Sequence, residues 1–372
     1  MTRGIIPAPI ASLPWRLILL LFTMTSFGTM VLYSAAGGSF QPWAGQHMIR
    51  FLVFLAMAIV MSRFPLDFWK KLTWPIYVGT LAMLFIVEMI GQVGGGSQRW
   101  INIGFMTIQP SELMKPAVVL AAAWFFDRLP ATKINSFDAI WPLGLLIALP
   151  SALVILQPDL DSSIAYIFGV AVVGFLAGLP LIYFLGAGGA LAVLTPLVYF
   201  FGMKEYQQNR VLIFLDPEKD PLGAGYHITQ SKIAIGSGGI FGKGFGNGTQ
   251  SHLDYLPEGH TDFVFATMSE EWGLMGGLFT LFCLFLLFRW GLRVSMASKS
   301  RYGQLVAAGL TCTIFFYAAI NLLMVVGFAP VAGLPLPFMS HGGNNMLTMM
   351  LCIGIIMSIE RHPGSRQGKF AG

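Results

Sequence analysis

Ten apolar runs divide this chain of 372 residues, and most are long enough for a helix that crosses a lipid bilayer. A spanning helix needs roughly 20 mainly apolar residues. Windows such as LFTLFCLFLLF are apolar on every side, unlike barrel strands, in which polar and apolar residues alternate. The runs lie near residues 16–36, 47–63, 72–90, 112–126, 140–157, 162–178, 180–201, 264–288, 304–327 and 343–359. We therefore expect an all-α polytopic membrane protein with ten transmembrane helices in a single domain over residues 1–372.

The Lys and Arg residues of the short loops predict the orientation of these helices. If the N-terminus is cytoplasmic, nearly all of these residues are cytoplasmic, and only Arg50 and Arg99 remain in short outer loops. We expect both termini and the 289–303 loop to be cytoplasmic, and the long 202–262 loop between the seventh and eighth helices to be exoplasmic. The net charge of +5 then reflects topology and indicates no nucleic-acid partner.

The segment from Glu205 to Gly273 interrupts the apolar pattern with many glycines, polar residues and acids. In this topology most acidic side chains of the chain fall at or near the outer surface. Ionisable groups beside apolar segments are often functional. We therefore expect the chemistry of the protein to take place outside.

Asp262 follows His260 and Thr261 where the chain enters the eighth expected helix. Low dielectric at a helix mouth can make a carboxylate more basic, so Asp262 could act as a general base. Alternatively, Thr261 or Asp262 caps the helix, since both residue types are common caps. The catalytic interpretation is favoured by the acidic and His neighbours, Glu258, His260, Glu270 and Glu271.

Gln109-Pro110-Ser111-Glu112 predicts a helix start, with Lys115 one turn deeper on nearly the same face as Glu112. Alternatively, Glu112 interacts only with the helix dipole while Lys115 snorkels outward. A lysine a full turn inside a span more often faces a polar cavity and an anionic partner. We expect Glu112 and Lys115 to line such a cavity, with Gln109 beside them.

Asp159 and Asp161 lie in a short acidic outer loop between two expected helices. Hard divalent cations prefer carboxylate oxygens, but the sequence nearby supplies no further ligands. We expect Asp161 or Ser162 to cap the next helix, which leaves Asp159 as the candidate metal ligand.

Two irregular segments could contact a ligand. In the glycine run 236–248, Ser237 and Gly244 depart from the P-loop pattern. Its backbone amides and Lys243 could still cradle a lipid-linked pyrophosphate, although a flexible loop of glycines with positive φ is an equal alternative. The segment 333–345 holds two prolines and a Gly-Gly pair. Such backbone at membrane depth must face protein or a water-filled cavity, so we expect this segment, with Ser340, to line the same cavity.

The three cysteines, Cys283, Cys312 and Cys352, each fall within an expected span at no metal-like spacing. We expect buried free thiols and no disulfide.

Several motifs together resemble one known family. They are QPSELMK at 109–115, QPDL at 157–160, GKGFGNGTQ at 242–250, LPEGHTDFVFA at 256–266 and GLPLPFMSHGG at 333–343. This set resembles the SEDS family of shape, elongation, division and sporulation proteins, and is more similar to its elongation branch than to its division branch.

The resemblance implies a ten-helix peptidoglycan glycosyltransferase that polymerises lipid II at the outer face of the bacterial cytoplasmic membrane, during cell elongation and rod-shape maintenance. It implies that Asp262 is the essential aspartate, that Glu112 and Lys115 are a buried pair beneath a central cavity, and that Asp159 is an outer-loop aspartate. The expected partners are a class B penicillin-binding transpeptidase and other membrane proteins of the elongation complex.

No cofactor is firmly expected. The cation that offsets phosphate charge could be Lys243, Arg210, Lys115 or a divalent metal, Mg²⁺ or Mn²⁺, with Asp159 or Asp262 as its ligand. His341, Asn344 and Asp161 stand where the family usually has Tyr, Ser and Gly. Two other functions are open, a flippase for lipid-linked precursors and a non-catalytic scaffold of the cell-wall complex. A flippase would place charges at both faces or at the midplane, whereas here they gather on one side.

Overall fold

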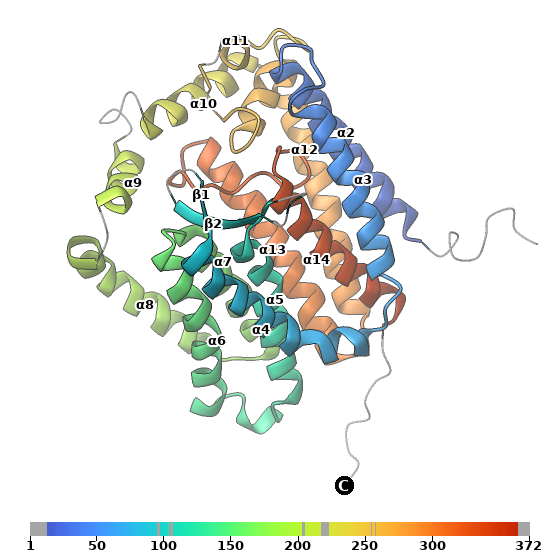
Figure 1. The fold of residues 1–372 in the computed structure, drawn as a ribbon, viewed down its shortest axis with the longest axis vertical. Coiled ribbons are helices and arrows are strands. Elements are labelled where there is room, and N and C mark those ends of the chain that lie inside the picture. Colours follow the sequence, from blue (N-terminus) through green and yellow to red (C-terminus); the bar gives the residue numbers. More distant parts are fainter. Residues whose placement is uncertain are drawn as a thin grey trace, which may run out of the picture.

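The protein is a bundle of long helices with a small sheet at one end (Figure 1). The computed structural model describes residues 13–94, 97–102, 104, 107–202, 205–216, 223–253, 255–256 and 258–363. The long helices are α2 (Trp15–Ala35), α3 (Ala44–Met61), α4 (Leu66–Ile90), α5 (Pro110–Arg128), α6 (Phe137–Leu156), α7 (Leu160–Ala177), α8 (Leu181–Leu197), α12 (Val264–Ala297), α13 (Arg301–Val325) and α14 (Gly343–Arg361). Short helical turns η1 (Ala131–Lys133) and η2 (Val198–Gly202) join some of them.

Each of the ten predicted runs corresponds to one of these helices, but they are not equally suited to cross a membrane. Within the described residues, eight helices are long and apolar enough to do so. The other two are α5, which contains Glu112, Lys115, Asp127 and Arg128, and α8, which has only 17 residues. The protein is therefore a multi-pass membrane protein, and α5 has the composition of a helix that is shielded from lipid by protein.

The segment predicted as a long loop contains three helices, α9 (Glu205–Leu215), α10 (Ala224–Gly238) and α11 (Thr249–His252). With α8, helices α9 and α10 run along the edge of the bundle in Figure 1. Helix α10 packs against α12. The long connection predicted between the seventh and eighth long helices therefore contains short helices, which the sequence prediction did not include.

A small antiparallel sheet precedes α5. Its strands are β1 (Gln92–Gly94), β2 (Ser97–Asn102) and β3 (Thr107–Ile108), in the order β1-β2-β3. Strand β2 pairs with β3 through Ile101 opposite Ile108. The sheet thereby fixes Gln109, which directly follows β3, at the start of α5.

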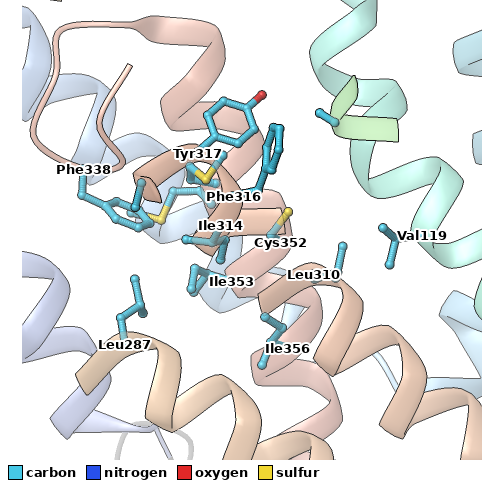
Figure 2. Close-up of a cluster of buried hydrophobic side chains, with 14 of the residues drawn as sticks. Val119, Leu287, Leu310, Ile314, Phe316, Tyr317, Phe338, Cys352, Ile353 and Ile356 are labelled. Carbon is cyan, nitrogen blue, oxygen red and sulfur yellow. The ribbon is translucent and has the colours of Figure 1, made fainter. Parts of the chain in front are cut away.

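The apolar core lies among α5, α12, α13 and α14 (Figure 2). Helix α5 is buried on nearly all sides, because small residues let its neighbours approach closely. At Gly309 of α13, an added Cβ would lie 2.6 Å from Val119 Cγ1 of α5. A larger residue at position 309 would therefore require the side chains of Val119 and of Val173 in α7 to shift.

A second close approach joins α2 to the segment before α14. A Cβ added at Gly28 would lie 2.7 Å from the Cα of Met339 and 2.8 Å from its carbonyl oxygen. Because these are backbone atoms, they could not rotate aside. Gly28 therefore sets how closely the segment that contains Ser340 and His341 packs on α2.

Cys283, Cys312 and Cys352 are free thiols, as predicted; Cys283 and Cys352 are buried and Cys312 is partly exposed.

Candidate active site

A cavity of about 1010 Å³ opens at one end of the bundle, where the segments that precede α5, α7, α12 and α14 meet. Its polar and charged lining comes from elements far apart in the sequence. The lining side chains include Arg99, Gln109, Glu112, Asp159, Asp161, Ser162, His227, Glu258, Thr261, Asp262, His341, Asn344 and Asn345. The structure thus brings together four of the predicted site residues, Gln109, Glu112, Asp159 and Asp262.

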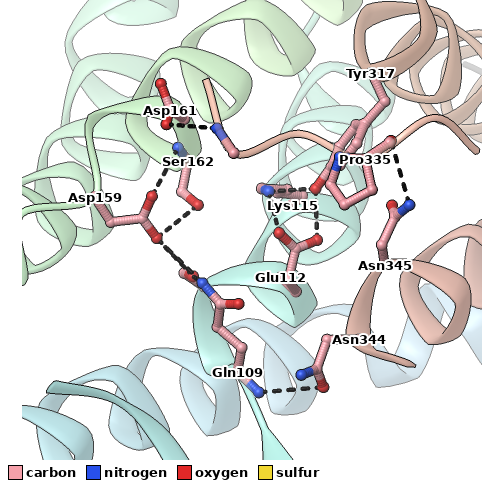
Figure 3. Close-up of polar contacts among 12 residues, drawn as sticks. Gln109, Glu112, Lys115, Asp159, Asp161, Ser162, Tyr317, Pro335, Asn344 and Asn345 are labelled. Atoms are coloured by element: carbon pink, nitrogen blue, oxygen red, sulfur yellow. Dashed lines mark hydrogen bonds and ion pairs between the residues drawn. The ribbon is translucent and has the colours of Figure 1, made fainter. Parts of the chain in front are cut away.

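Glu112 and Lys115 form a buried ion pair at the base of this cavity (Figure 3). Lys115 is 1% exposed, and its Nζ donates to Glu112 Oε1 at 2.6 Å. Tyr317 of α13 completes the group: its hydroxyl donates to Glu112 Oε2 at 2.5 Å and accepts from Lys115 Nζ. The pairing predicted from the spacing of one helix turn is present, and Glu112 is the member that lines the cavity.

Tyr317 was missed by the sequence reasoning, because a single tyrosine in an apolar span is common. Its hydroxyl is the only polar group of α13 that is fully buried against both Glu112 and Lys115 within the described residues. The usable signal was Asn321 four residues later, which places two polar side chains on one face of the same helix.

Asp159 is held by short polar side chains and is 4% exposed. Its Oδ2 accepts from Ser111 Oγ at 2.9 Å and from Ser162 Oγ at 2.9 Å, while Gln109 Nε2 lies 3.5 Å away. Its Oδ1 accepts from the Ser162 backbone N–H at 3.3 Å. Asp159 therefore links α5 to α7.

These contacts also correct a prediction. Asp159, and not Asp161 or Ser162, is the N-cap of α7, because the helix begins directly after it at Leu160. Asp161 instead accepts from the backbone N–H of Gly333 at 3.4 Å, so it contacts the segment that leads to α14.

Asp262 lies in the turn before α12, and the N-cap position of this helix is Phe263, with no side-chain cap hydrogen bond. The capping interpretation of Thr261 and Asp262 is therefore wrong. Asn321, which is fully buried, donates its Nδ2 at 2.8 Å to the carbonyl oxygens of both Asp262 and Leu334. The Asp262 carboxylate borders the opposite segment, since its Oδ2 is 3.9 Å from an added Cβ at Gly333.

His260 and His341 lie beside each other above α3. The ring of His260 stacks on Trp43 at 4.0 Å between centroids, and its carbonyl accepts from the backbone N–H of His341 at 2.9 Å. Arg50 Nη1 lies 3.3 Å from His341 Nε2. Because a guanidinium can only donate, Nε2 must accept, and His341 is neutral in this arrangement.

Burial lowers the pKa of both histidines. For His341 the pKa falls to about 4, first through burial and then through the charges of Arg50 and His260. For His260 burial lowers the pKa, and the charge of Glu258 opposes this shift. Both rings therefore favour the uncharged form at neutral pH, which suits packing better than proton donation.

Two other predicted residues, Lys243 and Ser340, are not among the side chains that line the cavity. Lys243 Nζ donates to Glu270 Oε1 at 2.6 Å and to Thr249 Oγ1 at 2.7 Å. Ser340 Oγ accepts from the Leu336 backbone N–H at 2.8 Å and so stabilises a turn. Arg210 belongs to α9, but its side chain lies outside the part of the chain that the structure describes. Two cations near the cavity are Arg99, which lines it, and Arg50, which contacts His341.

Arg99 is fixed by backbone carbonyls of the loop before α7. Its Nε donates to Gln157 O at 2.9 Å and its Nη2 donates to Pro158 O. Both oxygens belong to the loop that positions Asp159. From the sequence, Arg99 was expected only as a marker of topology, because no sequence pattern shows that β1 and β2 pack over this loop.

The cavity offers carboxylates but no complete metal site. Across the described ranges, no group of three or more His, Cys, Asp or Glu side chains could hold a metal ion. Asp159 already accepts several protein hydrogen bonds.

Comparison with known proteins gives consistent relationships. A family model described as "Cell cycle protein" and named for FtsW, RodA and SpoVE matches residues 14–364. The peptidoglycan glycosyltransferase MrdB of Escherichia coli K12 is 40% identical over 351 residues, which cover 93% of each chain. The peptidoglycan glycosyltransferase RodA of Treponema pallidum is 30% identical over 426 residues, covering 94% of this chain and 98% of the relative.

Solved structures are also similar over most of the chain. One, described as "Structural coordination of polymerization and crosslinking by a peptidoglycan synthase complex", matches with a TM-score of 0.80 and 32% identity, over 94% of this chain and 98% of the other. RodA of Thermus thermophilus matches with a TM-score of 0.71 and 26% identity, over 94% and 97% of the two chains.

Proposed function

Since the chain belongs to the FtsW, RodA and SpoVE family of cell cycle proteins, we propose that it is a peptidoglycan glycosyltransferase that polymerises lipid II into glycan strands during cell elongation. The observation that carries the site assignment is Asp262, a carboxylate that lines the large cavity and is not required as the cap of α12.

In the proposed reaction, Asp262 accepts the proton of the acceptor sugar's 4-hydroxyl. The oxygen forms a bond to C1 of the donor sugar, and the bond from C1 to the diphosphate oxygen breaks. The polyprenyl diphosphate leaves with the electron pair, so it needs little protonation. Arg99 is the lining side chain best suited to offset its negative charge. The sequence had suggested Lys243, Arg210, Lys115 or a divalent metal ion for this role.

The buried group of Glu112, Lys115 and Tyr317 has a positioning role in this proposal. The Lys115 ammonium and the Tyr317 hydroxyl each donate to one oxygen of Glu112. The carboxylate at the base of the cavity is therefore held in one orientation. Asp159 has a related role, because it ties the start of α5 to the start of α7. Both groups fix the positions of helices that border the cavity, where the sugar would bind.

The proposed setting is the bacterial cytoplasmic membrane, with ten spans, both termini cytoplasmic and the cavity exoplasmic. The distribution of Lys and Arg supports this orientation. Cysteine labelling of intact cells should modify positions introduced in 223–238 and spare those in 289–303. The reverse pattern would invert the topology.

The proposed partner is a class B penicillin-binding transpeptidase, with further membrane proteins of the elongation complex. The match to a synthase complex that coordinates polymerisation and crosslinking supports this proposal. The protein is 32% identical to the matched chain of this complex, over 94% of its own length. A binding surface for a second protein is therefore compatible with the shared fold.

The decisive experiment is polymerisation of purified lipid II by the purified protein, alone and with the transpeptidase. Glycan strands should form with the wild-type protein and not with Asp262→Asn. Two other outcomes would replace the proposal: lipid II transport across vesicles without polymerisation would indicate the flippase, and neither activity in the assembled complex would indicate a scaffold.

A further inference from the structure

A second cavity, of about 410 Å³, lies at the other end of α5 and is not used by the proposed reaction. It is lined by Asp67, Lys70, Lys71 and Trp74 of α4 and by Trp124 and Arg128 of α5. Trp124 and Arg128 are 12 and 16 residues beyond Glu112 on the same helix. At 1.5 Å per residue, roughly 20 Å separates this cavity from the active-site cavity.

The α4 lining forms one continuous helix face. Three residues follow Asp67 at spacings of three, four and seven: Lys70, Lys71 and Trp74. Residues at these spacings lie on the same face of a helix. Helix α4 has 25 residues, so it is about 37 Å long, whereas the hydrocarbon core of a bilayer is about 30 Å thick. Its first turns therefore have the length to reach the headgroup layer.

Two of the charged groups are already paired inside the protein. Lys70 Nζ lies 2.5 Å from Asp127 Oδ2, and Asp127 Oδ1 accepts from the Tyr302 backbone N–H at 3.1 Å. This pair joins α4, α5 and α13. Lys71 and Arg128 form no ion pair within the described residues, and neither does Asp67.

One of the unpaired cations, Arg128, packs on a pair of tryptophans. Arg128 Cζ lies 4.1 Å from the centroid of Trp124, and the rings of Trp124 and Trp74 meet edge to face at 5.4 Å. A guanidinium that stacks by its face keeps its N–H groups in the plane, where they can bind an anion. Tryptophan also prefers the membrane interface. With Asp127 included, the cavity carries a net single positive charge.

An exposed apolar stripe continues from the cavity along α4. The stripe consists of four side chains that are 39% to 70% exposed: Trp74, Val78, Phe85 and Met89. Their successive spacings of four, seven and four residues place them on one face of the helix. Such a stripe is suited to an acyl chain that runs from a headgroup into the membrane. A soluble phosphate would contact only the cavity and gain nothing from the stripe.

We propose that this cavity between α4 and α5 binds the headgroup of an anionic phospholipid. Lys71 and Arg128 would contact the phosphodiester, and the acyl chain would lie along Trp74, Val78 and Phe85. The single negative charge of a phosphatidylglycerol-type headgroup matches the net charge of the cavity. Each interfacial Lys or Arg strengthens the attraction for an anionic lipid about fivefold. This site is independent of the proposed glycosyl transfer.

Native mass spectrometry of the purified full chain tests the proposal, with dioleoylphosphatidylglycerol and dioleoylphosphatidylcholine as probes. The wild-type protein should bind the anionic lipid at least roughly tenfold more tightly, because two cations contribute. The double variant Lys71→Gln/Arg128→Gln should lose this preference. Thermal unfolding at an unchanged temperature would show that the variant remains folded.

Arg289→Gln/Lys299→Gln is the matched control, because it removes one arginine and one lysine that are exposed elsewhere. It should keep the preference for the anionic lipid. Equal binding of both lipids by the wild-type protein would overturn the proposal, as would an equal loss in the control. Displacement of the lipid by millimolar glycerol 3-phosphate would also overturn it, since recognition would then rest on a soluble phosphate.

Discussion

Two lysine–glutamate pairs in this protein have the same N–O distance of 2.6 Å and very different surroundings. Lys115 and Glu112 are one turn apart on α5, and Glu112 faces the large cavity. Lys243 and Glu270 are 27 residues apart, and they join the glycine-rich turn after α10 to α12. The N–O distance alone therefore does not distinguish a pair that borders the cavity from a pair that joins two segments of the fold.

The second pair closes a turn. Glu270 is fully buried and also accepts from the backbone N–H groups of Thr249 and Gln250, at 2.9 and 3.0 Å from Oε1. The backbone N–H of Lys243 donates to the Glu270 carbonyl at 3.0 Å. Gly242, with φ of 80°, would place a Cβ 2.0 Å from the Glu271 carbonyl oxygen. The glycines thus allow close packing on α12, and the alternative of a positive-φ loop is confirmed at this position.

The largest expected loss of polymerisation rate comes from a substitution of Asp262, and the effects expected for the two lysine–glutamate pairs are compared with it. Asp262→Asn keeps the shape of the side chain but removes the basic oxygen, so polymerisation should fall by roughly a hundredfold or more. Lipid II polymerisation by equal amounts of folded protein measures it. A near wild-type rate would remove Asp262 from the reaction.

The next effect is expected at the cavity pair. Glu112→Gln and Lys115→Met should each strongly reduce polymerisation, because each leaves a buried charge without its partner. The double variant should lose little more than either single one, since the two act as a unit. A double-mutant cycle of initial rates tests this, and fully additive losses would show that the two residues act separately.

The Lys243 and Glu270 pair should give the contrasting result. Glu270→Gln weakens several charge-assisted hydrogen bonds, so the free energy of unfolding should fall by about 1–3 kcal/mol. The rate of the remaining folded protein should change less than about twofold, because neither residue lines the cavity. Thermal unfolding and polymerisation, measured on the same preparation, separate the two effects. A large loss of rate without loss of stability would support the pyrophosphate cradle suggested by the sequence.

The smallest effect concerns His341, whose pKa of about 4 lies below its ordinary value of 6.5. The unfolded chain then binds more protons than the folded one, so stability should be fully present above pH 6.5 and decline as the pH falls toward 4. His341→Phe should reduce this part of the pH dependence. Thermal unfolding between pH 4 and 7.5 measures it. An unchanged pH dependence in the variant would assign the effect to other groups.

The long helices were the most predictable part of the structure, because the thickness of a bilayer requires long apolar runs. Helix α10 was missed, since its sequence AGYHITQSKIAIGSG is polar and rich in glycine. Its position is fixed by packing on α12, which no local pattern shows.

The site was predictable where one short segment carries the geometry, as for Glu112 and Lys115. It was not predictable where distant segments meet. Asp159 caps α7 because the helix starts one residue after it, and boundaries are the least certain part of a sequence prediction. Arg99 and Tyr317 reach the site only through the packing of the sheet and of α13.

Gly28 does not line the active-site cavity, but a mutation at this position should still impair the site. No side chain of α2 is among those around the cavity in the described part of the chain, yet one extra carbon there would push against the backbone of Met339. That displacement would be passed along two peptide units to His341, which does line the cavity. A screen for inactive alleles should therefore recover Gly28→Ala among the site mutations, and compensating alleles should shorten side chains around the same segment.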